Sequence, residues 1–117
     1  MPLRVYAYEK CDTCRKALRF LRERGIGHEV IPIREQPPTK TELRTMLSRV
    51  GELRRLFNTS GQDYRALGLG KKLPTMTDDE AIALLATNGN LVKRPFLLGK
   101  DWGTVGFNEG EWGERLK

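Results

Sequence analysis

The stretch YEKCDTCRKA, residues 8–17, decides the fold because it holds both cysteines of the protein where a strand pattern gives way to a helix pattern. Before it, the segment LRVYAY at residues 3–8 alternates apolar side chains (Leu, Val, Ala) with Arg and Tyr. This two-residue period is typical of a strand. Cys11 follows this strand, and Cys14 stands at the first apolar position of the helix pattern. The pair could be part of a zinc site, a structural disulfide or a reactive thiol.

The next segments extend this unit on the carboxyl-terminal side. Apolar side chains recur at helical spacing over residues 14–21, and Gly25 can end the helix. Asp12 or Thr13 can cap its start. A second strand pattern follows at residues 28–33. Two strands joined through one helix predict a right-handed parallel βαβ unit.

The middle of the chain is expected to be mostly helical. Two capping boxes of the form Thr-x-x-Glu, at residues 39–42 and 77–80, each predict the start of a helix. The segment NTSGQDY, residues 58–64, is expected to be a loop. The last of these helices is expected to end in TNGN, where Gly89 suits a left-handed cap.

The carboxyl-terminal part predicts a hairpin and a weak helix. PFLLGKDWGTVGF, residues 95–107, reads as two short antiparallel strands, and residues 108–116 form the expected helix. The order βαβ, helices and ββα fits an α/β fold with a mixed four-stranded sheet. The 117 residues suffice for a single domain over 1–117.

Composition excludes several classes of function. The net charge of +6 is compatible with an anionic substrate or with solubility alone, and the basic residues are spread along helices without a nucleic-acid-binding motif. We therefore expect no direct nucleic-acid partner. No apolar run is long enough to cross a bilayer and no secretory signal is visible, so we expect a cytoplasmic protein with reduced thiols.

The cysteine pair favours chemistry over structure. A closed structural zinc site requires four ligands, usually Cys or His. The chain contains two cysteines and one histidine, His28, so no metal is expected. A disulfide across so short a loop would restrain little of the unfolded chain. A thiol at the start of a helix lies over unpaired N–H groups, which favour the thiolate of Cys11.

Neighbouring residues support this interpretation. Lys10 and Arg15 flank the pair and add positive potential. Cys14 lies one turn further on and can resolve a mixed disulfide formed at Cys11, as in redox C-x-x-C motifs. Cys14 also belongs to the apolar stripe of the helix, so simple packing in the core remains a second interpretation.

A proline far downstream adds to the candidate site. In LVKRPFLL, residues 91–98, Pro95 opens an expected strand, a position that invites a cis peptide bond after Arg94. Arg94 would then supply a fixed cation for an oxyanion or a carboxylate.

The chain resembles the glutaredoxin-like arsenate reductase (ArsC/Spx) family, as a small C-x-x-C member. The matching segments are KCDTCRKA, QPPTKTEL, FNTSGQDYRALGL, LVKRPFLL and GTVGFNEGEW. The resemblance implies a thioredoxin-like fold with a helical insertion at about residues 39–86, a cis Pro95, and a thiol-dependent reductase with Cys11 as nucleophile. It implies catalytic and substrate-binding residues at Cys11, Cys14, Arg94, Lys10, Thr13, Arg15 and Pro95.

The resemblance also implies partners. Cys14 or glutathione would resolve the adduct on Cys11, glutaredoxin would restore the thiol, and no bound cofactor is expected. The substrate would be arsenate or a glutathione mixed disulfide, and the protein would act as a monomer. The alternative is a redox-sensing regulator of the Spx type, which would bind RNA polymerase.

One departure from the family pattern bears on the substrate. The better-studied reductases bring three arginines to the oxyanion, and only Arg94 aligns cleanly here. Asn58 and Asn108 stand where the other two are expected, although Arg55 or Arg65 could substitute from nearby. An amide gives up the charge and the bidentate geometry of a guanidinium.

Overall fold

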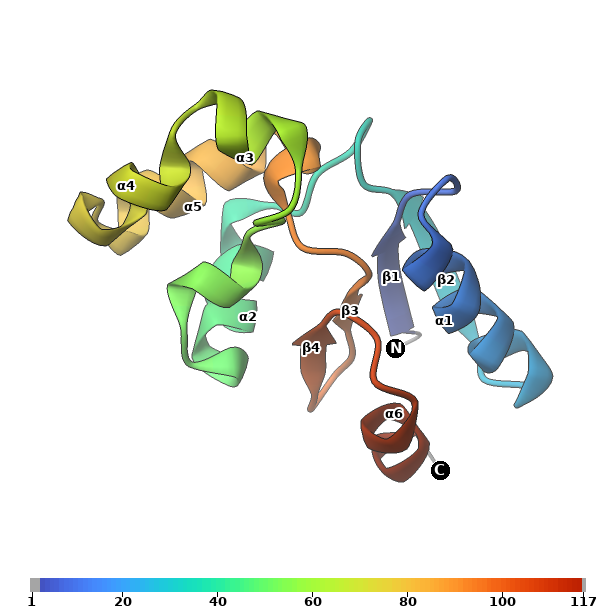
Figure 1. Cartoon of the computed structure of the whole chain (residues 1–117). Coiled ribbons are helices and arrows are strands. Elements are labelled where there is room, and N and C mark those ends of the chain that lie inside the picture. Colours follow the sequence, from blue (N-terminus) through green and yellow to red (C-terminus); the bar gives the residue numbers. More distant parts are fainter. Residues whose placement is uncertain (1–2, 117) are drawn as a thin grey trace.

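A computed structural model describes residues 3–116 of the chain and contains one mixed four-stranded sheet. The strands are β1 (Leu3–Ala7), β2 (His28–Pro32), β3 (Phe96–Leu98) and β4 (Gly103–Val105). Their order is β2-β1-β3-β4, with β1 and β2 parallel and the other pairs antiparallel. This arrangement (Figure 1) confirms the α/β fold class expected from the sequence.

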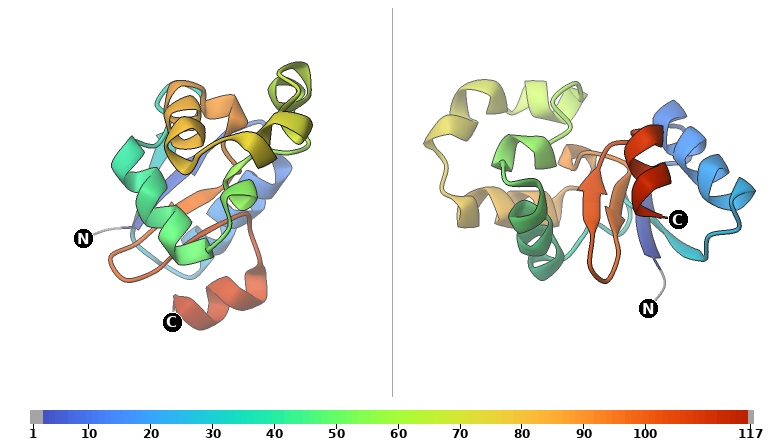
Figure 2. Two further views of the ribbon diagram at one scale, coloured as in Figure 1. Left: turned by 90° about the vertical axis from the view of Figure 1, so that its left-hand side faces the viewer. Right: turned by 90° about the horizontal axis from the view of Figure 1, so that it is seen from below.

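Helices cover both faces of the sheet. They are α1 (Asp12–Glu23), α2 (Lys40–Val50), α3 (Gln62–Ala66), α4 (Leu69–Lys72), α5 (Asp78–Thr87) and α6 (Glu109–Arg115). Figure 2 shows α1 and α6 together on one side, and α2 on the other. Residues 40–87, here called the helical segment, extend from α2 beyond the edge of the sheet (Figure 1). Within residues 3–116, no helix has the length and apolarity needed to span a membrane.

The central strand β1 is buried on both faces. Val5 and Ala7 belong to the core under α1 and α6, where Trp112 is also fully buried. Tyr6 points the other way, into the core shared with the helical segment, and is only 1% exposed. The alternation in β1 therefore separates two apolar cores rather than a core from solvent, as expected for a strand covered by helices on both sides.

Two predictions for the middle of the chain are wrong. Helix α3 begins at Gln62, inside the predicted loop 58–64. Gly89 does not adopt a left-handed conformation and instead opens a 3₁₀ turn. Position 89 must be glycine because the backbone of Ile33 lies very close to it. An ideal Cβ at Gly89 would lie 1.8 Å from the carbonyl oxygen of Ile33. This contact packs the turn that follows the helical segment against the chain leaving β2.

A buried polar cluster joins β1 to the helical segment. The Tyr6 hydroxyl donates to Glu42 Oε1 over 2.6 Å, and Arg4 Nη1 lies 2.5 Å from Glu42 Oε2. Glu42 also accepts the backbone N–H of Thr39 in the capping box at the start of α2. Burial and the neighbouring Glu42 raise the pKa of Tyr6, which keeps its hydroxyl protonated as a donor.

We expect Glu42→Ala to lower the free energy of unfolding by about 2 kcal/mol or more, because it leaves the buried Tyr6 hydroxyl without an acceptor. Urea unfolding monitored by circular dichroism measures the change. Glu80→Ala is the matched control, since Glu80 occupies the same capping-box position in α5 but is fully exposed and has no partner outside that box. An equal loss in both variants would show that the cap alone matters.

Gly89→Ala should destabilise the protein by about 3 kcal/mol or more, because the added methyl group meets the backbone of Ile33 and one of the two segments must move. Gly27→Ala is the control, because nothing lies within 4 Å of the corresponding Cβ position. Thermal unfolding of both variants tests the close approach, and equal melting temperatures would contradict it.

Candidate functional site

Cys11 itself caps helix α1. Its Sγ accepts the backbone N–H of Cys14 over 3.5 Å, and its own N–H donates to the carbonyl oxygen of Tyr8 over 3.0 Å. The predicted caps, Asp12 and Thr13, are wrong, because both residues lie inside the first turn of the helix. A sulfur in the cap position lies at the positive end of the helix dipole.

The environment of Cys11 favours its thiolate. Partial burial raises the pKa of this thiol, but the hydrogen bonds from Cys14, the positive charge of Arg94 and the backbone N–H of Thr13 together outweigh burial. The net result is a pKa below the ordinary value of a cysteine. Cys11 is half-buried and free, so its sulfur is available to react.

Cys14 is the opposite case. Its side chain is fully buried in the core under α1, and its Sγ accepts the backbone N–H of Tyr8 over 3.5 Å. Burial raises the pKa of Cys14 to about 12, with a further increase from the hydrogen bond and charge of Cys11. At neutral pH one cysteine is therefore disposed to ionise and the other stays a thiol.

The Arg94–Pro95 peptide bond is cis, as expected. The charge of Arg94 acts on both cysteines, which brings residues far apart in sequence to one site. The guanidinium carbon of Arg94 lies 5.1 Å from the centroid of the Tyr8 ring. Its Nη1 is buried, and no residue in the described part of the chain accepts a hydrogen bond from it. The described residues therefore leave this charged donor without an acceptor.

The three residues that flank the thiol are exposed. The side chains of Lys10 and Thr13 are exposed, and Thr13 acts on the site through its backbone N–H. Arg15 pairs with Asp12 on the surface of α1. A local acid thus neutralises Arg15, and Arg94 is the cation that acts on the Cys11 sulfur.

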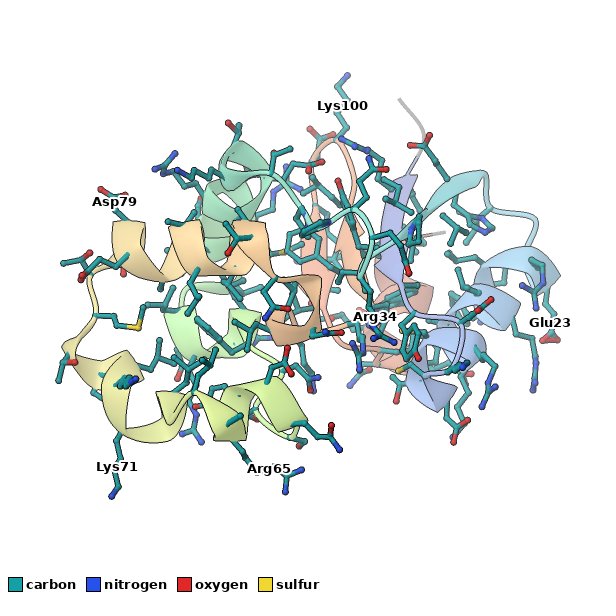
Figure 3. All side chains as sticks on the ribbon, turned by 90° about the horizontal axis from the view of Figure 1, so that it is seen from above. Glu23, Arg34, Arg65, Lys71, Asp79 and Lys100 are labelled. Carbon is teal, nitrogen blue, oxygen red and sulfur yellow. The ribbon has the colours of Figure 1, made fainter. Side chains whose placement is uncertain are left out.

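A cavity of about 510 Å³ lies beside Arg94 at the end of the sheet. We call it the arginine cavity, and it is lined by Tyr8, Arg34, Asn58, Ser60, Gly61, Gln62, Asp63, Asn90 and Arg94. Arg34 Nη1 donates to the Tyr8 hydroxyl over 2.7 Å, and the Arg34 guanidinium lies 4.7 Å from the centroid of the same ring. Figure 3 shows Arg34 between the helical segment and the sheet.

Sequence reasoning missed Arg34 as a site residue. It directly follows the expected strand at residues 28–33, and parallel strands bring their carboxyl ends to the same edge of a sheet. That rule would have placed Arg34 near the end of β1 and therefore near Cys11. Asp63 was missed because its region was expected to be a loop, and its position depends on how the helical segment packs.

The positions expected to hold arginines lie in two different places. Asn58 lines the arginine cavity. Asn108 is exposed and caps α6, where its Oδ1 accepts the N–H of Glu111 over 2.9 Å. Arg55 binds the carbonyl oxygen of Val50, and Arg65 points outward from α3 (Figure 3). The second arginine of the cavity is therefore Arg34.

A metal centre has no support in the described residues, since residues 3–116 contain no group of three His, Cys, Asp or Glu side chains that could hold an ion. The Nδ1 atom of His28 lies 2.8 Å from the carbonyl oxygen of Ile26, so this ring nitrogen is engaged with the backbone.

Removing the charge of Arg94 should raise the pKa of Cys11 and slow its alkylation at pH 7 several-fold, because less thiolate is present. Iodoacetamide rates measured from pH 5 to 10 on wild type, Arg94→Gln and Arg15→Gln give this pKa directly. The rate of Arg15→Gln should stay near that of wild type, since Arg15 pairs with Asp12. A profile for Arg94→Gln that overlays the wild-type profile would refute the role of Arg94.

A solved structure of high similarity has the same architecture. The ArsC family related protein from Bacteroides fragilis is 44% identical, with a TM-score of 0.94 over 100% of this chain and 98% of that chain. This similarity confirms the thioredoxin-like fold that the resemblance implied.

Curated relatives fall into three kinds. The uncharacterized protein YusI of Bacillus subtilis is 46% identical over 97% of this chain and 98% of its own length. The regulatory protein MgsR of Bacillus subtilis is 30% identical over 93% of this chain and 86% of its own length. The arsenate reductase of Neisseria meningitidis is 28% identical over 89% of each chain.

The model of the ArsC family matches residues 6–115, which includes both cysteines, Arg94 and every residue that lines the arginine cavity. With a match over nearly the whole length and a thioredoxin-like fold built around a helix-capping cysteine, the chain belongs to the ArsC family.

Proposed function

We propose that the protein is a thiol-dependent reductase in which the Cys11 thiolate is the nucleophile. The observation that carries this proposal is the position of the Cys11 sulfur, which accepts the Cys14 N–H at the start of α1 within reach of the charge of Arg94. A thiolate held in this way is both available at neutral pH and close to a cation that can bind the substrate.

The proposed substrate is a mixed disulfide of glutathione rather than arsenate. Two guanidinium groups, from Arg34 and Arg94, line the cavity, and Asn58 supplies an amide where the resemblance implies a further arginine. An amide gives neither the charge nor the bidentate geometry that a compact oxyanion requires. A carboxylate of glutathione is planar and pairs with guanidinium groups, so the two arginines present can bind it without a third cation.

The proposed reaction is a pair of thiol–disulfide exchanges. The Cys11 thiolate attacks the glutathione sulfur, a bond forms between the two sulfurs, and the original disulfide breaks. The released thiolate takes a proton from water. A second glutathione thiolate then attacks the glutathione sulfur held on Cys11, releases glutathione disulfide and restores the Cys11 thiolate.

Glutathione is the proposed resolving thiol, and Cys14 has a supporting role. Cys14 is fully buried, and the rise of its pKa to about 12 leaves almost no thiolate at neutral pH. A buried thiol is a poor nucleophile but can donate a hydrogen bond to the Cys11 thiolate. The proposal includes a monomer in a reducing cytoplasm, with glutathione or glutaredoxin supplying the electrons.

Turnover of a glutathionylated peptide, followed through the glutathione disulfide released, tests the proposal. Cys11→Ser should abolish turnover, because a hydroxyl at that position is not ionised at neutral pH. Cys14→Ser should keep most of it, since a solution thiol resolves the adduct. Equal losses in both variants would assign resolution to Cys14, and faster turnover of arsenate than of the peptide would make the oxyanion the substrate.

A redox-sensing regulator that binds RNA polymerase is the second candidate. It is favoured by the 30% identity to the regulatory protein MgsR and by the two free cysteines within hydrogen-bonding distance of one another. A pull-down of RNA polymerase with the oxidised and the reduced protein separates the candidates. Polymerase bound in only one redox state, without turnover of the peptide, would support the regulator over the enzyme.

A further inference from the structure

The arginine cavity carries charges of both signs. Arg34 and Arg94 come from chain segments at the end of the sheet, after β2 and before β3. Asp63 comes from the first turn of α3, in the helical segment. The cavity is therefore not a simple anion site, because a carboxylate on its wall repels an oxyanion as strongly as each arginine attracts one at equal distance.

On the cationic side of the cavity, Arg34 and Arg94 have hydrogen-bond donors that no carboxylate in the described part of the chain accepts. The Arg34 guanidinium is held by the Tyr8 hydroxyl, and both arginines lie within 5.1 Å of the centroid of the Tyr8 ring. In the described residues, neither arginine pairs with a carboxylate within 4.0 Å. The buried Nη1 of Arg94 also lacks an acceptor. A planar, charged acceptor such as a carboxylate fits these donors.

The acidic side is fixed and also lacks a counterion. Asp63 Oδ2 accepts the side-chain amides of Asn88 and Asn90, over 3.1 and 3.4 Å. These amides hold the carboxylate but do not neutralise it. No basic side chain among residues 3–116 lies within 4.0 Å of Asp63. A carboxylate held in a cavity without a cation favours a ligand that brings an ammonium group.

We infer that the arginine cavity binds the zwitterionic end of a thiol of the glutathione class, with a ligand carboxylate on Arg34 and Arg94 and the ligand ammonium on Asp63. The assignment rests on the proposed function, since the thiol must reach Cys11, and it specifies which part of the substrate this chain recognises. Tyr8 connects the two places, because its ring lies in the cavity and its carbonyl oxygen accepts the Cys11 N–H.

The dimensions of the site agree with such a ligand. About 510 Å³ lies within the range of pockets that hold small organic molecules. A tetrahedral oxyanion would occupy a small part of this volume and would bring no cation to Asp63. A ligand that ends in both an ammonium and a carboxylate uses both sides of the cavity.

Binding of S-methylglutathione to the Cys11→Ser protein tests the assignment without any reaction. The matched probe is N-acetyl-S-methylglutathione, which keeps every carboxylate and lacks the ammonium group. We expect acetylation to weaken binding about ten-fold, in the range measured for a single charged contact. Isothermal titration calorimetry at low salt gives both dissociation constants.

The variants separate the two sides of the cavity. Asp63→Asn should remove the difference between the two probes, and it keeps an oxygen for the amides of Asn88 and Asn90. Asp79→Asn is the control, because Asp79 is an exposed carboxylate of the helical segment that points away from the cavity (Figure 3). Arg34→Gln should weaken binding of both probes equally, and Arg44→Gln should leave both unchanged.

Three results would overturn the assignment. They are equal binding of the two probes to the Cys11→Ser protein, an unchanged ammonium preference in Asp63→Asn, and tighter binding of arsenate than of S-methylglutathione. The comparison of the two probes on the Cys11→Ser protein needs no change at Asp63. It therefore tests the assignment even if Asp63→Asn fails to fold. If the wild-type protein does not turn over the glutathionylated peptide but Cys11→Ser still binds S-methylglutathione more tightly than the acetylated probe, the proposed reaction is rejected and the ligand assignment is supported.

Discussion

The hydrogen bond from the Cys14 N–H to the Cys11 sulfur is the contact on which the site depends. The first N–H groups of a helix have no partners within the helix, so some atom outside it must accept them. In α1 that atom is a sulfur, supplied by the turn that follows the central strand. One interaction therefore starts the helix and biases the thiol toward its ionised form.

The rest of the fold brings a second set of side chains to this turn. Two contacts fix the helical segment relative to the sheet, namely the Tyr6–Glu42 hydrogen bond and the close approach of Gly89 to Ile33. The second contact lies directly between the chain that carries Arg34 and the turn that carries Asn90. The arginine cavity is thus formed by backbone packing as much as by its own side chains.

Local sequence patterns predicted the parts of this structure that local forces determine. The capping boxes at Thr39 and Thr77 start helices as expected, because their partners lie three residues away. The parallel βαβ unit followed from periodicity. Cys11 was assigned the right place but the wrong structural role, since a cysteine is not among the usual helix caps and Asp12 and Thr13 stood beside it.

The parts that could not be predicted depend on distant contacts. Gly89 fits a left-handed cap by sequence, yet it is glycine because the backbone of Ile33 leaves no space for a side chain. Asn108 aligned with an expected arginine, but it caps α6 on the other side of the sheet. Asp63 gave no signal at all, because only the packing of the helical segment brings it to the same cavity as the two arginines.

The division of the interior into two apolar cores has an evolutionary consequence. The two cysteines pack with the core under α1 and α6. Tyr64, Leu91 and Val92, which follow the cavity residues Asp63 and Asn90 in the sequence, belong to the core on the opposite face. Substitutions in separate, non-contacting regions have nearly additive effects. A descendant of this chain can therefore change the part of the cavity wall that the helical segment supplies, while it keeps Cys11 and the Tyr8 and Arg94 contacts that tune its sulfur.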